Sequence, residues 1–240
     1  MLALIRWLLL LVVACGDPAA PRLLVYTRTL GYRHDDSIIA GSATLPAKLA
    51  ERGIVADVTE DPAVFTAENL ARYRAIAFMY TTGNDILDAD GKLAFEQFVR
   101  GGGGWLGIHS ATDTEYMWPF YQELIVTPFR THPIIQPGTL TIEAPDHPAM
   151  RDLPSPWPAT DEWYDFVGNP RDTAGVAILA TIDEASYTGG SSGADHPLIW
   201  SHERLGGRAL YSAIGHVANR WNEPDYLGHV IASVRWVMRE

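Results

Sequence analysis

The chain has 240 residues, of which 47% are hydrophobic and 20% are charged, a balance typical of a folded domain rather than a disordered segment. Its net charge of −11 repels the phosphate backbone of nucleic acids, so we expect no nucleic-acid partner. The single cysteine, Cys15, excludes an internal disulfide and a zinc site built from several thiolates.

The first residues, 1–14, are typical of an export signal. Arg6 precedes an apolar run that ends in Ala14, and this run is shorter than the roughly 20 residues that span a membrane. Cys15 follows directly, as in a bacterial lipobox, which predicts a lipid anchor at Cys15 and a tether over residues 15–21. The alternatives are an uncleaved anchor and a signal peptide without lipid. We therefore expect a protein exported to the bacterial cell envelope, with one domain over residues 22–240.

Strands and helices alternate through the first half of this domain. Apolar runs predict strands at residues 23–27, 55–59, 75–80 and 105–108, and apolar spacing predicts helices at 36–52, 66–71 and 88–99. This order is typical of a parallel sheet with helices on both faces, in which ligands bind beyond the carboxyl ends of the strands. The rule places a site at residues 27–36, 80–85 and 109–118.

The second half of the domain is richer in β-structure. We predict strands at 140–143, 176–182, 198–202 and 208–214, a turn at 204–207 and a terminal helix at 225–239. His229 is expected on the surface of that helix. The stretch from Pro145 to Arg171 predicts a long irregular loop, and its aromatic residues indicate that the loop is packed and functional.

His109 has the position expected of a reactive group at a strand end. The residues Gly107-Ile-His-Ser-Ala111 predict a tight turn from a strand into a helix, which would present His109 beside free backbone N–H groups. There it can act as a base or a metal ligand, with Ser110 as the alternative nucleophile. The other interpretation is that His109 only caps the helix and packs.

A second imidazole is predicted at the end of the strand over 208–214, where His216 follows Gly215. The alternative for His216 is an ordinary surface histidine. His109, His132 and His216, with one carboxylate, would form a site for Zn²⁺ or Mn²⁺, but no H-x-x-x-H spacing supports this metal site.

Two further segments predict contacts with a substrate. Beyond the first strand, Arg33 and His34 can bind an anion or a polyol, whereas Asp36 or Ser37 can cap the next helix. Aromatic rings beside carboxylates, as at residues 161–164, are a typical lining for a carbohydrate because the C–H faces of a sugar stack on rings.

Several segments in chain order resemble the ThuA-like (trehalose utilisation) family, from Leu23 to the C-terminal helix. They are residues 26–34, 81–85, 102–109, 113–119, 161–164, 195–197 and 215–216. The resemblance implies an α/β fold, a flavodoxin-like three-layer sandwich with a mostly parallel sheet, as in class I glutamine amidotransferases. His109 would hold the place of the amidotransferase cysteine and His216 that of its histidine, so the missing thiol argues against glutamine hydrolysis. The family usually has a glycine near Val126 and lacks Pro128, which predicts a different loop before His132.

The resemblance also implies a role in disaccharide or 3-keto-sugar metabolism, and some family members are associated with a bound metal. We therefore expect an enzyme whose partner is a small carbohydrate; the alternatives are a sugar-binding lipoprotein without catalysis and a scaffold protein. A homo-oligomer is left open. The expected catalytic residues are His109, His216, Asp113 and Glu162, and the expected substrate-binding residues are Arg33, His34, Trp118 and Trp163.

Overall fold

The computed structural model describes residues 20–240. The predicted signal peptide, the lipidation of Cys15 and most of the tether fall outside these residues and stay predictions, which incorporation of labelled palmitate at Cys15 would test. Among the residues described, no helix is long and apolar enough to cross a membrane.

One side of a nine-stranded sheet is parallel. It contains, in spatial order, β2 (Val55–Thr59), β1 (Arg22–Tyr26), β3 (Ala75–Met79), β4 (Gly104–Ile108) and β11 (Ala209–Ser212). The residues of β3 and β4 are all buried, as expected of parallel strands that are covered on both faces.

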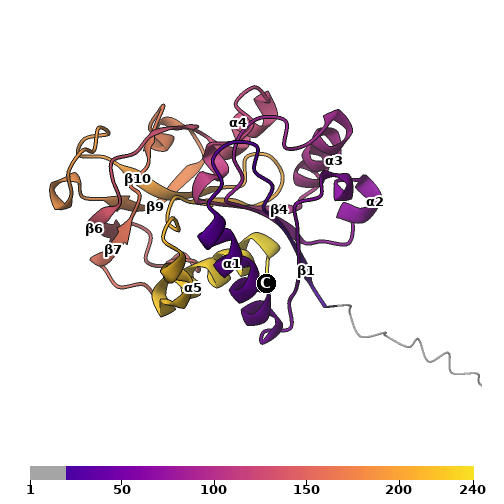
Figure 1. Ribbon diagram of the computed structural model, residues 1–240, viewed down its shortest axis with the longest axis horizontal. Coiled ribbons are helices and arrows are strands. Elements are labelled where there is room, and N and C mark those ends of the chain that lie inside the picture. The colour runs from indigo at the N-terminus through magenta and orange to yellow at the C-terminus, as the bar shows by residue number, and fades with distance from the viewer. Residues whose placement is uncertain (1–19) are drawn as a thin grey trace, which may run out of the picture.

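Helices cover both faces of this parallel half. The helices α1 (Asp35–Ala50) and α5 (Pro224–Met238) lie on one face, and α2 (Ala67–Leu70), α3 (Ala89–Arg100) and α4 (Pro119–Ile125) lie on the other (Figure 1). The predicted three-layer α/β sandwich is therefore confirmed. Because β1, β3, β4 and β11 run in parallel, their carboxyl ends open onto the same edge of the sheet, where the sequence rule expects a ligand.

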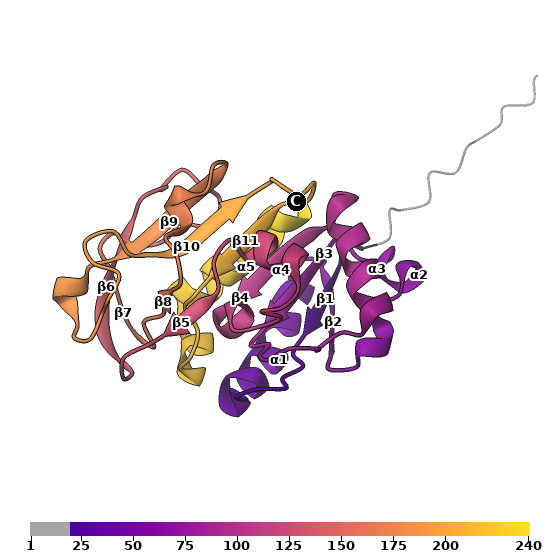
Figure 2. The same cartoon turned by 90° about the horizontal axis from the view of Figure 1, so that it is seen from above.

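The other side of the sheet is antiparallel. The strands β10 (Pro197–His202), β9 (Val176–Ile182), β6 (Gln136–Ile142) and β7 (Trp157–Asp161) continue it in this order beyond β11 (Figure 2). The predicted turn at 204–207 connects β10 to β11. A separate two-stranded sheet pairs β5 (Phe129–Thr131) with β8 (Asp165–Phe166).

The stretch from Pro145 to Arg171 is not one irregular loop, because it contains β7 and β8. The side chains of β7 alternate between buried and exposed, which is the pattern of a strand with one covered face. Pro158 obscures this pattern in the sequence. It is tolerated because β7 is the last strand of the sheet, where a missing N–H breaks no ladder on the open side.

Two other residues differ from their expected surroundings. Val126 ends α4 with φ of 74° and ψ of −48°, a conformation that strains a β-branched residue and suits the glycine of the resembling family. His229 is not a surface residue of α5. Its Nδ1 lies 3.0 Å from the carbonyl oxygen of Ala149, and its Nε2 lies 3.1 Å from the hydroxyl of Ser212.

Candidate functional site

His109 stands at the tip of β4, at the start of the short 3-10 helix η2 (His109–Thr112), so the predicted tight turn is present. Its side chain is fully buried and its backbone φ is 53°. Nδ1 lies 2.7 Å from the carbonyl oxygen of Ala213 and donates its proton there, which leaves a lone pair on Nε2. The hydroxyl of Tyr164 lies 3.1 Å from this Nε2 atom. His109 thus presents a lone pair to its surroundings rather than merely filling space.

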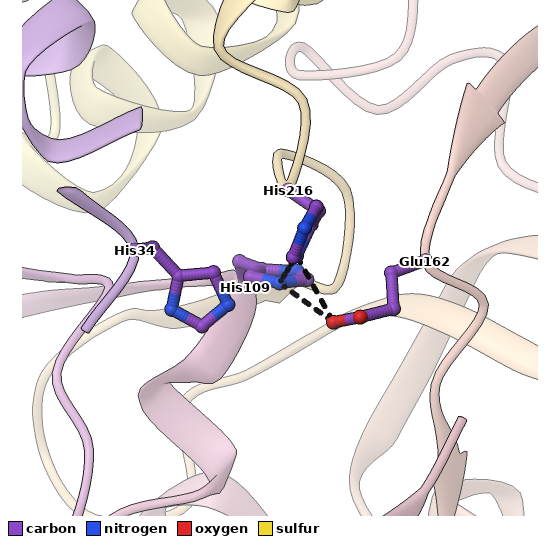
Figure 3. A group of neighbouring side chains, drawn as sticks. All are labelled: His34, His109, Glu162 and His216. Atoms are coloured by element: carbon purple, nitrogen blue, oxygen red, sulfur yellow. Dashed lines mark hydrogen bonds and ion pairs between the residues drawn. The ribbon is translucent and has the colours of Figure 1, made fainter. Parts of the chain in front are cut away.

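Glu162 approaches His109 and His216 from the end of β7 (Figure 3). Its Oε2 atom lies 3.1 Å from Nδ1 of His216 and 3.4 Å from Nε2 of His109, and these two nitrogens are 3.3 Å apart. Three segments far apart in the chain therefore bring together one carboxylate and two imidazoles.

Contacts within this group shift the pKa values of Glu162 and His216. Burial would raise the pKa of Glu162, but the neighbouring imidazoles of His109 and His216 outweigh burial and hold the pKa well below its ordinary value. Burial would lower the pKa of His216, but its hydrogen bond with Glu162 and the charges of Glu162 and Asp161 leave that pKa raised. The carboxylate of Glu162 therefore favours the protonated form of His216.

His34 completes the group from the loop before α1 (Figure 3). Its ring centroid is 4.8 Å from that of His109 and 5.0 Å from that of His216. The Nδ1 atom of His34 is buried and has no hydrogen-bond partner. Burial, and then repulsion by His109 and His216, lower its pKa to about 3, so His34 is neutral at pH 7.

These four side chains fit a divalent metal ion. One ligand atom from each of His34, His109, Glu162 and His216 lies within 4.8 Å of the others. Metal–ligand bonds of about 2.1 Å in a tetrahedral site separate the ligands by roughly 3.4 Å, close to the distances found among the last three residues. Imidazole and carboxylate donors suit Zn²⁺ and Mn²⁺, and the contact of His109 with a backbone carbonyl is the usual support of a ligating histidine.

A pocket of about 590 Å³ opens beside His34 and His216. Tyr32, Ile135 and Arg33 also line it, so the pocket combines an aromatic ring, an aliphatic side chain and a cation. The guanidinium of Arg33 is already paired with Glu60 at 2.6 Å and lies at the rim of the pocket. The substrate-binding residues predicted in this loop, Arg33 and His34, therefore do line a pocket.

Three residues outside the predicted catalytic and metal-binding sets hold this group together. Both oxygens of Asp161, at the end of β7, accept backbone N–H groups: Oδ1 that of His216 at 2.9 Å and Oδ2 that of Gly215 at 2.8 Å. The hydroxyl of Ser37 donates to the carbonyl of His216, so Ser37 does not cap α1 as expected. Tyr164 packs its ring on His109, with centroids 4.4 Å apart. Asp161 and Tyr164 lie beside Glu162 in the chain, which was the available signal.

The predicted set of metal ligands included His132, and the structure does not place this residue in it. It contacts the other oxygen of Glu162, with Nδ1 3.0 Å from Oε1, and its side chain is 38% exposed. It does not belong to the group whose ligand atoms converge, in which His34 and Glu162 join His109 and His216 instead.

Three other predicted site residues lie outside the group. Asp113 accepts a hydrogen bond from Tyr116 at 2.6 Å, and burial raises the pKa of Asp113. Trp118 packs against the rings of α3 and α4, including Phe95 at 5.9 Å, and belongs to the core. Trp163 is fully buried, and its ring occupies the space where a side chain on Gly138 would stand.

A family model described as trehalose utilisation, ThuA, matches residues 22–237. The chain belongs to the ThuA family. A ThuA-like protein from Bacteroides uniformis is 23% identical, with a TM-score of 0.80 over 92% of this chain and 93% of that chain. A second ThuA-like protein, from Parabacteroides merdae, is 18% identical, with a TM-score of 0.73 over 91% of this chain and 90% of that one. At these identities the structural likeness shows the fold alone.

The expected relation of this ThuA chain to class I glutamine amidotransferases is confirmed at the level of fold. PurLQS from Thermotoga maritima is 12% identical and matches with a TM-score of 0.53, over 90% of this chain and 99% of that chain. A β-galactosidase from Bacillus circulans matches with a TM-score of 0.56 and 11% identity, over 91% of this chain and 31% of that one. No curated protein matches the chain.

Proposed function

We propose that this ThuA chain is an enzyme that acts on a disaccharide or a 3-keto-sugar, with His34, His109, His216 and Glu162 as its catalytic centre. The observation that carries the proposal is the convergence of these four groups beside a pocket at the carboxyl ends of the parallel strands. The link of the ThuA family to trehalose utilisation supports a carbohydrate as the substrate.

The protonation states of the centre suit acid and base roles. In a 3-keto-glycoside the C–H bond next to the ketone is acidic. The Nε2 atom of His109 takes that proton, since its Nδ1 donates to the carbonyl of Ala213, and neutral His34 lines the adjoining pocket. The electron pair of the broken C–H bond forms a carbon–carbon double bond, and the glycosidic C–O bond breaks. His216, whose protonated form the neighbouring Glu162 favours, gives its proton to the departing oxygen. The products are an unsaturated keto-sugar and an alcohol.

The same residues would hold a divalent ion, with His109, His216 and Glu162 nearest to one another. A bound Zn²⁺ or Mn²⁺ would supply Lewis-acid polarisation of the ketone oxygen. In either case the lone pair of His109 is aimed by its hydrogen bond to Ala213, and Asp161 fixes the backbone that carries His216.

Turnover of 3-keto-disaccharides by the purified protein tests the proposal, after chelation and again with added Zn²⁺ or Mn²⁺. We expect His109→Ala to lower turnover at least about 100-fold, the usual effect of losing a group that acts in proton transfer. His147→Ala is the matched control, because His147 packs on Trp236, away from the four groups, and should keep its activity.

Two results would contradict catalysis at this centre. Full activity in His109→Ala would remove the proposed residues from the reaction. Saturable binding of sugar that is recovered unchanged, with only the affinity altered in His109→Ala, would instead indicate a non-catalytic sugar-binding protein.

A further inference from the structure

A second cluster of titratable side chains lies away from the proposed catalytic centre. It contains Asp165 in β8, Glu184 in the short helix η4 (Glu184–Ser186) and His196 just before β10. One ligand atom of each lies within 4.8 Å of the others. The side chains of Asp165 and His196 are almost fully buried, at 0% and 1% exposed, while that of Glu184 is 19% exposed.

His196 has the arrangement of a metal ligand. Its Nε2 lies 2.8 Å from the carbonyl oxygen of Tyr164 and donates there, so a neutral ring carries its lone pair on Nδ1. This Nδ1 atom lies 2.9 Å from Oε1 of Glu184, and the hydroxyl of Tyr187 lies 3.1 Å away. A lone pair and a carboxylate oxygen repel each other at this distance unless a proton or a metal ion lies between them.

Asp165 has a buried carboxylate oxygen without a hydrogen-bond partner, an observation independent of the geometry of His196. Its Oδ1 atom accepts hydrogen bonds from the hydroxyl of Ser192 at 2.6 Å and the N–H of Ser191 at 3.2 Å. Its Oδ2 atom is buried and has no partner, which is costly for a carboxylate. The guanidinium of Arg130 lies 3.8 Å from Oδ1, and its side chain is 46% exposed, so it does not satisfy Oδ2.

We propose that Asp165, Glu184 and His196 form a second divalent-metal site, which takes Zn²⁺ or Mn²⁺. Two carboxylates and one imidazole are hard and borderline donors, which suit these ions. A pocket of about 180 Å³ is lined by His196 and by Ser192, whose hydroxyl donates to Asp165. The site is structural: it ties the long connection between β9 and β10 to β8, beside the residue that packs on His109.

The site is independent of the proposed catalysis, and zinc binding to the full chain tests it. We expect Glu184→Gln, which keeps the shape of the side chain and loses its charge, to hold one zinc ion fewer per chain than the wild type. In competition with a chromophoric chelator, the affinity of that ion should fall by at least about 100-fold, more than the effect of an outer-shell change. The same loss should be seen whether or not Glu162→Gln is also present, which separates this site from the catalytic centre.

Glu143→Gln is the matched control, since Glu143 is paired with Arg171 at the surface and should bind zinc as the wild type does. Equal zinc content and equal affinities in Glu184→Gln and the wild type overturn the proposal, and leave His196 as a protonated partner of Glu184. Anomalous scattering from zinc-soaked wild-type crystals gives a test that needs no variant. A peak between Asp165 and His196 is expected, and its absence overturns the site.

Discussion

The hydrogen bond from Nδ1 of His109 to the carbonyl of Ala213 decides what the centre can do, because it aims one lone pair at Glu162 and His216. The hydroxyl of Tyr164 lies 3.1 Å from the same nitrogen, Nε2. Burial raises the pKa of Tyr164 well above its ordinary value, so its hydroxyl stays protonated and acts as a donor. The protein therefore places a fixed hydroxyl donor 3.1 Å from Nε2 of His109.

At the scale of residues, the sequence indicates which side chains belong to the site better than it indicates which side chains they contact. His109, His216 and Glu162 could be selected because they follow strand ends or lie among aromatic residues. Trp163 was predicted to contact the substrate, but its neighbour Tyr164 is the residue that contacts His109. In an extended chain, neighbouring side chains point to opposite sides, so Glu162 and Tyr164 are expected on one side and Trp163 on the other. The exclusion of His132 depends on a distance that only the folded chain defines.

Asp161→Asn tests the support of His216. An amide offers only one oxygen, so one of the N–H groups of Gly215 and His216 loses its acceptor. We expect a loss of about 1–3 kcal/mol in the free energy of unfolding and roughly 100-fold lower turnover, because His216 moves. Urea denaturation and the 3-keto-sugar assay measure the two effects.

Asp183→Asn provides the comparison, since Asp183 caps the exposed helix η4 and its replacement should cost at most about 1 kcal/mol with no change in turnover. Equal behaviour of the two variants would show that Asp161 does not position the site.

At the scale of elements, three neighbouring strands are each followed, within three residues, by a residue of positive φ. β3 is followed by Tyr80 with φ of 61°, β4 by His109 with φ of 53°, and β11 leads to Gly215 with φ of 140°. The hydroxyl of Tyr80 donates to the carbonyl of Gly215 at 2.8 Å and links two of these turns. Residues with such strained backbone conformations are concentrated at functional sites.

Gly215→Ala tests how tightly these turns are packed. A Cβ atom there would lie 2.6 Å from the hydroxyl of Tyr226 and 3.1 Å from that of Tyr80, at a φ that favours glycine. We expect the free energy of unfolding to fall by about 1–3 kcal/mol, together with loss of activity as His216 is displaced. Chemical denaturation and turnover check this.

Gly228→Ala in α5 makes the same chemical change where nothing lies within 4 Å, and should stabilise the protein by up to about 1 kcal/mol. If both variants were stabilised, the packing described around Gly215 would be incorrect.

The strands and helices of the parallel half were predictable because each buries a continuous apolar run. Two elements were not. α4 begins at Pro119, which suits the first turn of a helix but reads as a break in the sequence. β7 contains Pro158 and depends on its place at the sheet edge, which local sequence does not reveal.

For the whole molecule, the site depends on the meeting of two distant parts of one sheet. β7 is the last strand on the antiparallel side, four places from β11, yet Asp161 at its end holds the residues that follow β11. The antiparallel half must therefore curve back towards the carboxyl ends of the parallel strands. No local pattern carries this information, because it results from the accumulated twist of the sheet. The sequence predicts the edge where the site lies, but not the strand that closes it.

His229 gives the folded protein a predictable response to acid. Burial lowers the pKa of His229 to about 4, whereas the unfolded chain has a histidine pKa of about 6.5. Between these values the unfolded state binds more protons, so the free energy of unfolding falls as the pH falls from about 6.5 towards 4. This residue alone should remove about 2 kcal/mol by pH 4.5.

Urea denaturation at pH 7 and pH 4.5 checks this effect. We expect His229→Asn to be less stable at pH 7 but to lose less stability on acidification than the wild type. The same decrease in both proteins would assign the acid sensitivity to other groups.

The backbone conformation of His109 lowers the stability of the fold, while the proposed function requires the imidazole at this position. A left-handed φ costs a residue with a side chain of the order of 1 kcal/mol, and glycine avoids most of that cost. Selection for heat resistance alone would therefore favour glycine at this turn, and would remove the imidazole with it. A thermostabilised variant that retains His109 would therefore have to gain its stability at other positions.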